Sequence, residues 1–567
     1  MKDISVVLIA KNEEKTLPRL LESLKGINDI VLVDTGSTDN TVKIARDAGC
    51  NVEEVGDRFK IGPTQEQIDS WKKDYGMEPS FKLGEKYFHY ANARNYAASL
   101  AKNDWVFSAD CDEAIDWDLD KVREAIQDED HLTYRFCYTH NPDGSCALEF
   151  QQCKMYRKSK LKWTKWIHEV LTEIEPCKPP KYCDFIYHNH WQNPESKRGH
   201  YLPGLELSVL DQPNDDRNVY YLGREYLWSK KYQEAIVFLE KASELSQWMP
   251  EKSQAHVFMG EAYEHLGDIN KAIDCYLKAI SVYGLRREPY WSLGQAYEKL
   301  KRPSEAKVWY QAALGVEYNP QGYLTEMTYY EWRIPDQLAT LSSDKEECKK
   351  WWVESLKHNP DKRILNNVKY FYDTPLISII VPVVRKEGFK RLTESIKENT
   401  VFPNYEIICR DEDGTAIKKF NDGVRESKGE FIVFLADDTE VMLGWLTQAF
   451  VHFKENLHGK GIVVLNDEGW KESIAHHFLI SRNCLDDLEN NEIFYRGYNH
   501  CGVDVELAAQ MKKRGLYTYC KDAGLKHYHY CLSTRGVEPN KRDGWYKKVD
   551  AWREDDKKLL DERLEKI

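Results

Sequence analysis

Two closely spaced aspartates are the strongest sign of chemistry in this chain. Asp110 and Asp112 stand one residue apart, directly after the apolar run Trp105-Val106-Phe107. If that run is a β-strand, residues two apart point to the same side, so the two carboxylates converge where the strand ends. Paired carboxylate oxygens suit a hard divalent cation such as Mg²⁺ or Mn²⁺, and such a cation suits a diphosphate. Surface turns also carry Asp-x-Asp, so the surrounding sequence has to decide.

Strands and helices alternate around these positions. Residues 4–10 are a continuous, β-branched apolar run that predicts a buried strand, and residues 30–33 predict a second one. Helical leucine spacing over 16–24 and a helix from about residue 40 separate the strands. This rhythm favours a parallel sheet, in which ligands bind beyond the carboxyl ends of the strands. Polar residues at such ends are Asn12, Glu13, Asp34, Asp110 and Asp112.

Four segments carry a family resemblance. VVLIAKNEE, LVDTGSTDNT, YANARNYAA and FSADCDE follow in this order and resemble the motifs of inverting family 2 glycosyltransferases of the GT-A fold, over roughly residues 1–200. The resemblance implies that Asp34 contacts the nucleotide base and that the loop at Asn12-Glu13 lines the same pocket. It also implies that Arg94 lies near the base or the phosphates.

The same resemblance suggests the reacting groups. It implies that Asp110 faces the ribose or the sugar, that Asp112 binds the metal and that His188 completes the coordination, with His190 as the alternative. Inverting transfer needs a group that takes the proton of the acceptor hydroxyl, and Glu169, in a His-Glu pair that such enzymes also show, is the candidate base. A histidine near aromatic residues is more often a hydrogen-bonded structural residue.

Some of these residues have a structural alternative. Asn95 could cap a helix, and Asp39 could cap the helix that follows it. Residues 58–88 depart from the pattern as an insertion that contains Trp71 and several Gly and Pro residues. The insertion could be an acceptor-binding flap or a solvated excursion.

A repeat follows from about residue 214. Glycines recur with spacings of 260 − 223 = 37 and 294 − 260 = 34, each after an apolar residue and three residues before a tyrosine. This period resembles the tetratricopeptide repeat, whose helix pairs must stack to bury their apolar faces. The array could bind a partner or space two domains, and it could also pair two chains into a homodimer.

The strand and helix pattern of the N-terminal region recurs from about residue 375. LISIIVPVV, YEIIC and FIVFLADDTE are separated by helical segments, and they too resemble a family 2 glycosyltransferase domain. The implied roles are nucleotide binding for Asp411 and Asp437, metal binding for Asp438 and His527, and base catalysis for Asp504.

This half departs from the family pattern. The acidic triplet is reduced to Ala436-Asp437-Asp438, and Val503 replaces the glutamate expected before Asp504. Zinc on His527, His529 and Cys531 is an alternative, but paired cysteine spacing is missing.

Composition bounds the function classes. The 567 residues should form several domains, and the net charge of 80 − 93 = −13 gives no general attraction to nucleic acid or anionic lipid. The first apolar run starts at Ile4, which leaves no room for a secretory signal, and no run is long enough for a membrane span. The 14 cysteines form no Cys-x-x-Cys pair, so we expect reduced thiols and a cytoplasmic protein.

The predicted fold class is α/β plus all-α. Two Rossmann-like GT-A domains, residues 1–205 and 373–567, flank a tetratricopeptide-like array over 206–372. The expected function is the transfer of a sugar, with inversion, from a nucleoside diphosphate sugar such as a UDP-sugar to a hydroxyl group. The acceptor would be a glycan, a protein or another molecule, and the reaction would depend on Mn²⁺ or Mg²⁺. Both domains would act on one glycan or modified polymer. In the alternative, only the N-terminal domain is active, the C-terminal domain is a binding module and the repeats are a scaffold for a protein acceptor.

Overall fold

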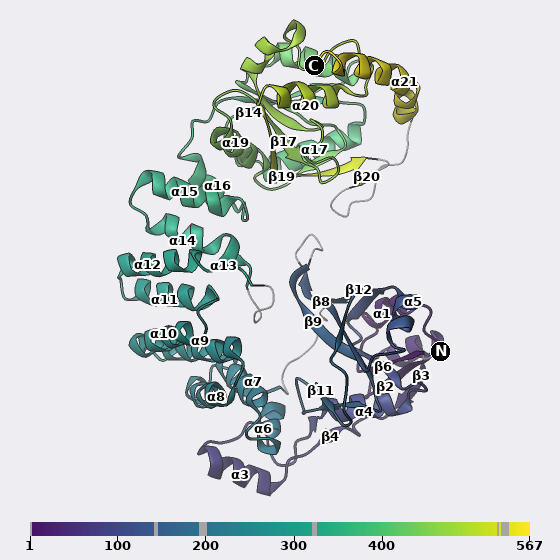
Figure 1. Ribbon diagram of the computed structural model, residues 1–567, viewed down its shortest axis with the longest axis vertical. Coiled ribbons are helices and arrows are strands. Elements are labelled where there is room, and N and C mark those ends of the chain that lie inside the picture. Colours follow the sequence, from purple (N-terminus) through teal and green to yellow (C-terminus); the bar gives the residue numbers. More distant parts are fainter. Residues whose placement is uncertain (1–2, 141–145, 192–200, 320–325, 530–531, 534–543) are drawn as a thin grey trace. The chain divides into compact units, whose positions relative to one another are not determined.

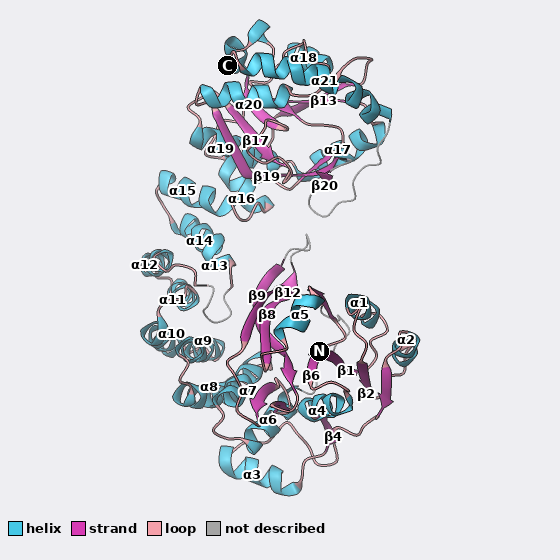
Figure 2. Cartoon of the chain, turned by 45° about the vertical axis from the view of Figure 1, so that its right-hand side comes forward, coloured by secondary structure: helices cyan, strands magenta, loops and turns pink. Residues whose placement is uncertain are grey.

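The chain divides into two compact units, residues 1–326 and 327–567. Each unit contains a mixed β-sheet with helices, and the first also contains helical repeats, so the predicted combination of α/β and all-α parts is confirmed (Figure 2). The predicted boundaries at 205 and 372 fall inside these units and stay predictions. The computed structural model describes residues 3–140, 146–191, 201–319, 326–529, 532–533 and 544–567 (Figure 1).

The N-terminal sheet has eight strands in the order β3-β2-β1-β6-β9-β8-β12-β7. The neighbours β3, β2, β1 and β6 run parallel, β9 is antiparallel to both β6 and β8, and β7 is antiparallel to β12. The strands are β1 (Ile4–Ala10), β2 (Ile30–Asp34), β3 (Asn51–Glu54), β6 (Trp105–Ala109), β7 (Glu113–Trp117), β8 (His131–His140), β9 (Cys146–Arg157) and β12 (Lys181–His190).

Apolar residues on both faces of β1 explain its unbroken hydrophobic run. Val6 and Leu8 pack into the core under α1, α2 and α5, whereas Val7 packs into the core under α4. A strand covered on both faces needs no polar residue along its length. The carboxyl ends of β1, β2 and β6 therefore meet at one edge. The covering helices are α1 (Leu17–Ser23), α2 (Thr41–Asp47), α4 (Tyr90–Leu100) and α5 (Leu119–Ala125).

The insertion at 58–88 docks the N-terminal sheet onto the repeats. The Trp71 ring is fully buried and stacks on Phe238 of the repeats, with ring centroids 5.7 Å apart. Buried Glu206 accepts hydrogen bonds from the backbone N of Ser80 (2.6 Å) and from the Tyr226 hydroxyl (2.7 Å). The insertion is therefore no solvated excursion. Its elements are β4 (Lys60–Ile61), α3 (Gln65–Tyr75) and β5 (Tyr87–Phe88).

The recurring glycines are points of close helix contact. A Cβ at Gly260 would lie 2.3 Å from the Tyr276 ring, and one at Gly294 would lie 2.5 Å from the Tyr310 ring. Each glycine therefore lets one helix approach the next. The repeat helices are α6 (Tyr201–Asp211), α7 (Asp216–Trp228), α8 (Tyr232–Leu245), α9 (Met249–His265), α10 (Ile269–Tyr283), α11 (Glu288–Lys299) and α12 (Pro303–Leu314).

The second unit begins with four helices and continues into another mixed sheet, ordered β14-β13-β15-β18-β17-β19-β16, with β20 paired to β19. The strands are β13 (Ile377–Pro382), β14 (Tyr405–Arg410), β15 (Phe431–Phe434), β16 (Thr439–Val441), β17 (Ile462–Asn466), β18 (Phe478–Ser481), β19 (Tyr517–His529) and β20 (Leu532–Ser533). The helices are α13 (Thr328–Glu331), α14 (Arg333–Leu341), α15 (Lys345–Leu356), α16 (Lys362–Lys369), α17 (Lys386–Asn399), α18 (Ala416–Glu426), α19 (Trp445–Asn456), α20 (Val503–Lys513) and α21 (Gly544–Leu564), with short 3₁₀ turns at Arg482–Asp487 and Glu489–Asn491.

The two sheets share one topology. In chain order, β13 to β19 take the places that β1, β2, β6, β7, β8, β9 and β12 take in the first sheet. Each pair of neighbours also has the same relative direction: parallel for β13 with β14 and β15, antiparallel for β15–β18, β18–β17 and β16–β19, and parallel for β17–β19. Residues at corresponding strand ends can therefore be compared directly.

One expectation about cysteine fails. Cys137 and Cys146 are joined by a disulfide, so the thiols are not all reduced. None of the described helices combines the length and the apolar character that a transmembrane span needs.

The dock around Trp71 yields a first prediction. Trp71→Ala removes a fully buried ring, so we expect it to weaken the packing of α3 on the repeats by about 3–5 kcal/mol. Hydrogen exchange of the full chain should show faster exchange of α3 and α8 amides. The matched variant Trp228→Ala, at a ring that is 51% exposed, should change stability by no more than about 0.5 kcal/mol. Equal exchange in the two variants would contradict the docking role.

Candidate functional site

The turns after β1 and β2 are tied to each other. Asn12 adopts a left-handed backbone (φ 59°), its Oδ1 accepts a hydrogen bond from the Thr38 N (2.7 Å), and its own N donates to the Ser37 Oγ (2.9 Å). The buried Asp34 carboxylate accepts from the backbone N of Gly36 (3.0 Å) and of Ser37 (3.1 Å). Asp34 thus shapes the turn, and its contact with a nucleotide base stays a prediction.

A second set of bonds joins the same turns. The Glu13 N donates to the Thr41 Oγ1 (2.7 Å), and the Glu14 carboxylate accepts from the Asn40 N (3.1 Å). Asp39 accepts from the Thr41 N (3.0 Å), at the first residue of α2, and from the Glu14 N (3.1 Å). Asp39 therefore holds the start of α2 against the β1 turn. Hydrogen bonds between the two strand-end loops thus fix their conformation.

Arg94 links the candidate base to the first aspartate. The buried guanidinium donates to Asp110 Oδ1 through Nη2 (2.6 Å), to Glu169 Oε1 through Nε (2.7 Å) and to Ser108 Oγ through Nη1 (3.2 Å). Asn95 lies inside α4 and bonds both backbone groups of Trp163, so the alternative that it caps a helix is wrong. Arg94 is held between two carboxylates, which keeps its pKa above the usual value although burial lowers it.

Lys154 on β9 and Glu113 on β7 complete a buried network of charges. The Lys154 Nζ lies 2.7 Å from Asp110 Oδ2 and 2.5 Å from Glu113 Oε1, and the Asp110 N donates to Glu113 Oε2 (2.8 Å). Burial would raise the pKa of Asp110, but Arg94 and Lys154 outweigh it and hold that pKa well below its usual range. Sequence reasoning missed both Lys154 and Glu113; the only signal was the glutamate that closes FSADCDE.

His190, rather than His188, lies beside Asp112. The His190 Nε2 is 3.2 Å from Asp112 Oδ2, and its Nδ1 is 3.1 Å from the carbonyl oxygen of Tyr138. His188 is fully buried and instead lies 3.0 Å from Glu113 Oε2. Burial lowers the pKa of His190, but Asp112 raises it by more.

This arrangement fits a cation. The Tyr138 carbonyl can only accept, so the His190 Nδ1 carries a proton, and in the neutral ring Nε2 presents a lone pair to Asp112. Two acceptors 3.2 Å apart attract each other only through a proton or a metal ion between them. Ligands at about 2.1 Å in an octahedral Mg²⁺ or Mn²⁺ shell lie about 3.0 Å apart, close to this separation.

The register of the second sheet selects the same pair. His190 is paired with Glu113, the residue after Asp112, and His527 is paired in the same way with Thr439, the residue after Asp438. The backbone N after each histidine also donates to the carbonyl of the aspartate, at 2.7 Å and 2.9 Å. His190 and Asp112 therefore occupy the places of His527 and Asp438.

The strand end of the second unit is more closed. The Asp437 carboxylate accepts from the backbone N of Val384 (2.6 Å) and of Arg385 (2.5 Å), and burial beside Asp438 raises its pKa. The Arg385 Nη1 lies 3.6 Å from Asp438 Oδ2, and the His527 Nε2 lies 3.6 Å from Asp438 Oδ1. The Asp437 carboxylate thus fixes the backbone at residues 384–385, whereas Asp438 faces both His527 and Arg385.

The other residues predicted for this half lie on a turn and a helix of the same unit. Asp411 is exposed on the turn after β14. Asp504 lies in the first turn of α20, and its backbone carbonyl accepts from the Ala475 N (3.1 Å). Cys531 lies outside the described residues.

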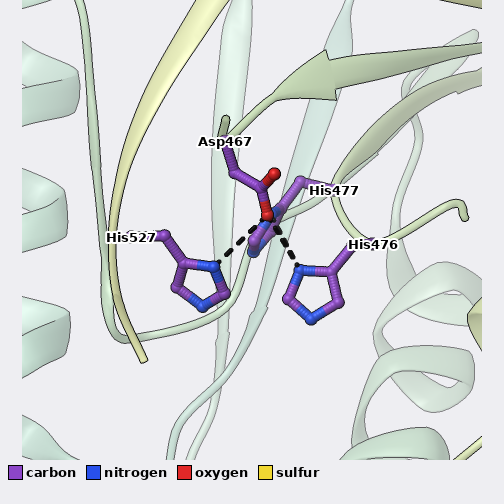
Figure 3. Close-up of side chains that lie close together, drawn as sticks. All are labelled: Asp467, His476, His477 and His527. Carbon is purple, nitrogen blue, oxygen red and sulfur yellow. Dashed lines mark hydrogen bonds and ion pairs between the residues drawn. The ribbon is translucent and has the colours of Figure 1, made fainter. Parts of the chain in front are cut away.

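Three histidines gather around a single carboxylate in this unit. His476, His477 and His527 turn their rings toward Asp467, as Figure 3 shows. Sequence reasoning named only His527; the signal for the others was a His-His pair just before β18 and an aspartate just after β17.

The loop that carries Glu169 is clamped by the first repeat helices. Lys165 (φ 77°) and His168 (φ 54°) adopt left-handed backbone, which is strained for such residues. The Lys165 Nζ contacts Asp215 Oδ1 (2.7 Å), and the His168 ring stacks on Tyr221 with centroids 4.2 Å apart. The loop, α4, α6 and α7 enclose a cavity of about 250 Å³, lined in part by His89, Asn92, Lys162, Trp166 and Asp211.

Comparison with known proteins supports two of the parts. Residues 5–54 match the family model of glycosyl transferase family 2, and residues 253–283 and 288–320 match that of the tetratricopeptide repeat. These matches agree with the predicted family 2 resemblance over the first two strands, and they confirm the predicted tetratricopeptide-like repeats.

Individual relatives cover part of the chain. An uncharacterized glycosyltransferase of Rickettsia typhi is 31% identical over 158 residues, which are 28% of this chain and 40% of that protein. The lipopolysaccharide core biosynthesis glycosyltransferase LpsC of Rhizobium meliloti is 29% identical over 178 residues, 29% of this chain and 56% of that protein. The crystal structure of MamA is 18% identical with a TM-score of 0.24, over 28% of this chain and 86% of that one. The chain thus spans about two fifths of the length of the Rickettsia relative.

The charge network around Lys154 yields a second prediction. Lys154→Met leaves Asp110 and Glu113 without their shared cation, which should lower the free energy of unfolding by about 3 kcal/mol at pH 7. A carboxyl whose folded pKa is depressed stabilises the fold above its unfolded pKa of about 3.9, and this contribution is lost as the pH falls through the folded value. The deficit should therefore shrink below about pH 4.

Urea unfolding of both chains at pH 7 and at pH 3.5 measures that deficit. Lys102→Met is the matched control, because the Lys102 side chain is 77% exposed and lies 3.7 Å from its partner Asp29. A deficit that does not change with pH, or one no larger than that of the control, would refute the role of the network.

Proposed function

We propose that the N-terminal unit is a metal-dependent inverting glycosyltransferase that takes a sugar from a nucleoside diphosphate sugar, a UDP-sugar, to a hydroxyl acceptor. The observation that carries the proposal is the Asp112–His190 pair, with Oδ2 and Nε2 3.2 Å apart, between β6 and β7 and at the end of β12. The family 2 match of β1 and β2 supports the nucleotide-sugar donor. The relative named for lipopolysaccharide core synthesis supports a glycan as acceptor.

Asp112 and His190 would hold the divalent ion, in place of the pair Asp112 and His188. When bound, Mn²⁺ or Mg²⁺ supplies Lewis-acid stabilisation of the charge on the departing diphosphate. Asn12, Glu13 and Asp34 line the preformed turns at the same sheet edge, where they would receive the nucleotide. The Asp110 carboxylate is paired with the side chains of Arg94 and Lys154 and would face the ribose or the sugar.

Glu169 is the proposed base. Arg94 binds its Oε1, so Oε2 takes the proton of the acceptor hydroxyl. The acceptor oxygen forms a bond to the anomeric carbon while the bond from that carbon to the diphosphate oxygen breaks on the opposite face. The configuration at the anomeric carbon is inverted in this single displacement, and no sugar is attached to the protein.

Two readings apply to the C-terminal unit. Its strand-for-strand topology and its Asp438–His527 pair support a second GT-A transferase, with Asp411 and Asp437 at the nucleotide and Asp504 as base. Arg385, 3.6 Å from Asp438, favours the other reading, in which a fixed guanidinium takes the place of an ion and the unit is a binding module. In that reading the repeats are a scaffold for a protein acceptor.

Removal of the Asp112 carboxylate tests the first unit. Asp112→Asn should lower diphosphate release in a nucleotide-sugar panel with Mn²⁺ by at least about 100-fold, because several kcal/mol of charge stabilisation are lost. The exposed Asp116 on β7 offers a matched control, and Asp116→Asn should retain the parent rate. Parent-like release by Asp112→Asn would exclude the proposed site.

The same panel separates the two readings of the second unit. If both units transfer sugars, Asp438→Asn should abolish one product and leave the product lost in Asp112→Asn. If the second unit only binds, Asp438→Asn should alter the KM for the acceptor without removing a product. A chain in which Asp112→Asn abolishes all transfer, while Asp438→Asn leaves every rate and KM unchanged, would count against both readings.

A further inference from the structure

The cluster around Asp467 brings together three separate parts of the second sheet. Asp467 follows β17, His476 and His477 precede β18, and His527 lies on β19 (Figure 3). Asp467, His477 and His527 are each at most 2% exposed, whereas the His476 side chain is 25% exposed. The cluster is therefore buried, and His476 is the member that reaches solvent.

The four ligand atoms of the cluster all lie within 4.8 Å of one another, and four of their six separations are close to the edges of a tetrahedron. The Asp467 Oδ2 lies 3.4 Å from the His476 Nδ1, 3.7 Å from the His477 Nδ1 and 3.3 Å from the His527 Nδ1. The Nδ1 atoms of His476 and His477 are 3.3 Å apart. Four ligands at about 2.0–2.1 Å from a tetrahedral Zn²⁺ lie about 3.3 Å from one another. One central ion would thus reach all four atoms.

Protons alone do not explain this convergence. A carboxylate oxygen offers about two lone-pair sites, yet three imidazole nitrogens face the single Oδ2 of Asp467. The facing Nδ1 atoms of His476 and His477 cannot both carry protons.

Neighbouring groups orient the side chains of Asp467 and His527, as the outer-shell partners of a metal site do. The other oxygen of Asp467, Oδ1, accepts from the backbone N of Gly469 (3.1 Å) and of Trp470 (3.2 Å), which turns Oδ2 toward the rings. The far nitrogen of His527, Nε2, lies 3.6 Å from Asp438. A carboxylate behind a ligating histidine fixes its tautomer and raises its basicity.

The N-terminal unit contains no equivalent among its described residues. There the Nδ1 of His190, the counterpart of His527, lies against the backbone carbonyl of Tyr138. In the second unit a carboxylate and two further imidazoles occupy that side of the ring. A carboxylate alone would suffice to orient His527 toward an ion at Asp438, so the added histidines call for a centre of their own.

We propose that Asp467, His476, His477 and His527 form a tetrahedral transition-metal site, with Zn²⁺ as the fitting ion. Three imidazoles and one carboxylate match the ligand preference of Zn²⁺, whereas Mg²⁺ and Ca²⁺ take oxygen ligands. Four protein ligands fill the shell, so the ion is structural and ties the 467–477 loop to β19. The site does not depend on sugar transfer by the N-terminal unit, and in the second unit it shares His527 with the Asp438 pair.

Cobalt substitution of the full chain tests the proposal. The metal-free chain, carrying Asp112→Asn so that the N-terminal pair does not contribute, is titrated with Co²⁺ and then with Zn²⁺. We expect one Co²⁺ per chain with the intense visible bands of tetrahedral coordination, and displacement by one Zn²⁺. His476→Gln and His477→Gln should each raise the dissociation constant by at least about 100-fold, more than loss of an outer-shell partner does.

Two further variants make the result specific. His458→Gln, at an exposed histidine, should bind like the parent, and Asp438→Asn should weaken binding by about 10–100-fold while the tetrahedral bands remain. His476 is partly exposed, so its variant is expected to fold, which far-ultraviolet circular dichroism checks. Weak binding without tetrahedral bands would overturn the proposal. So would binding that survives in both His476→Gln and His477→Gln but is lost in Asp438→Asn, since the ion would then lie between Asp438 and His527.

Discussion

The N-terminal site depends on a small set of buried charges that stabilise one another. Arg94 and Lys154 neutralise Asp110, Lys154 also reaches Glu113, and Glu113 faces His188. A buried charge is costly without partners, so the members of such a network have to be kept or lost together. The second sheet agrees with this: by strand register, apolar or uncharged residues replace four members at once, with Ala436, Phe478, Thr439 and Leu525 at the places of Asp110, Lys154, Glu113 and His188. The shared topology therefore does not require the network, which points to a task of the first unit alone.

The repeats hold the loop that carries Glu169 in the first unit. Two strained residues, Lys165 and His168, bracket the turn before Glu169 and are held by contacts to α6 and α7. Glu206 in α6 binds the insertion at 58–88 from the opposite side. A boundary at residue 205 would fall inside α6 and would separate Glu206, Asp215 and Tyr221 from the loop and the insertion that they contact. The loop of Glu169 would then lose the helices that hold it, so the repeats and the sheet should be studied as one piece.

The sequence was sufficient for the parts that depend on local pattern, and insufficient for those that depend on register. Continuous apolar runs predicted β1, β2 and β6, and glycines at a regular spacing predicted the repeats. The choice between His188 and His190 was out of reach, because residues two apart on a strand face the same side and only pairing with β7 separates them. Lys154 lies 44 residues from Asp110, and Asp467 lies 60 residues from His527, so each pair meets only through strand pairing.

The position of a donor-bound ion tests the central claim most directly. A crystal of the full chain with Mn²⁺ and uridine diphosphate would show the ion by its anomalous scattering. We expect a peak within bonding distance of Asp112 Oδ2 and His190 Nε2, with diphosphate oxygens completing the shell. A peak at His188, or a diphosphate bound with the proton-linked Asp112–His190 pair unchanged and no ion beside it, would contradict the account.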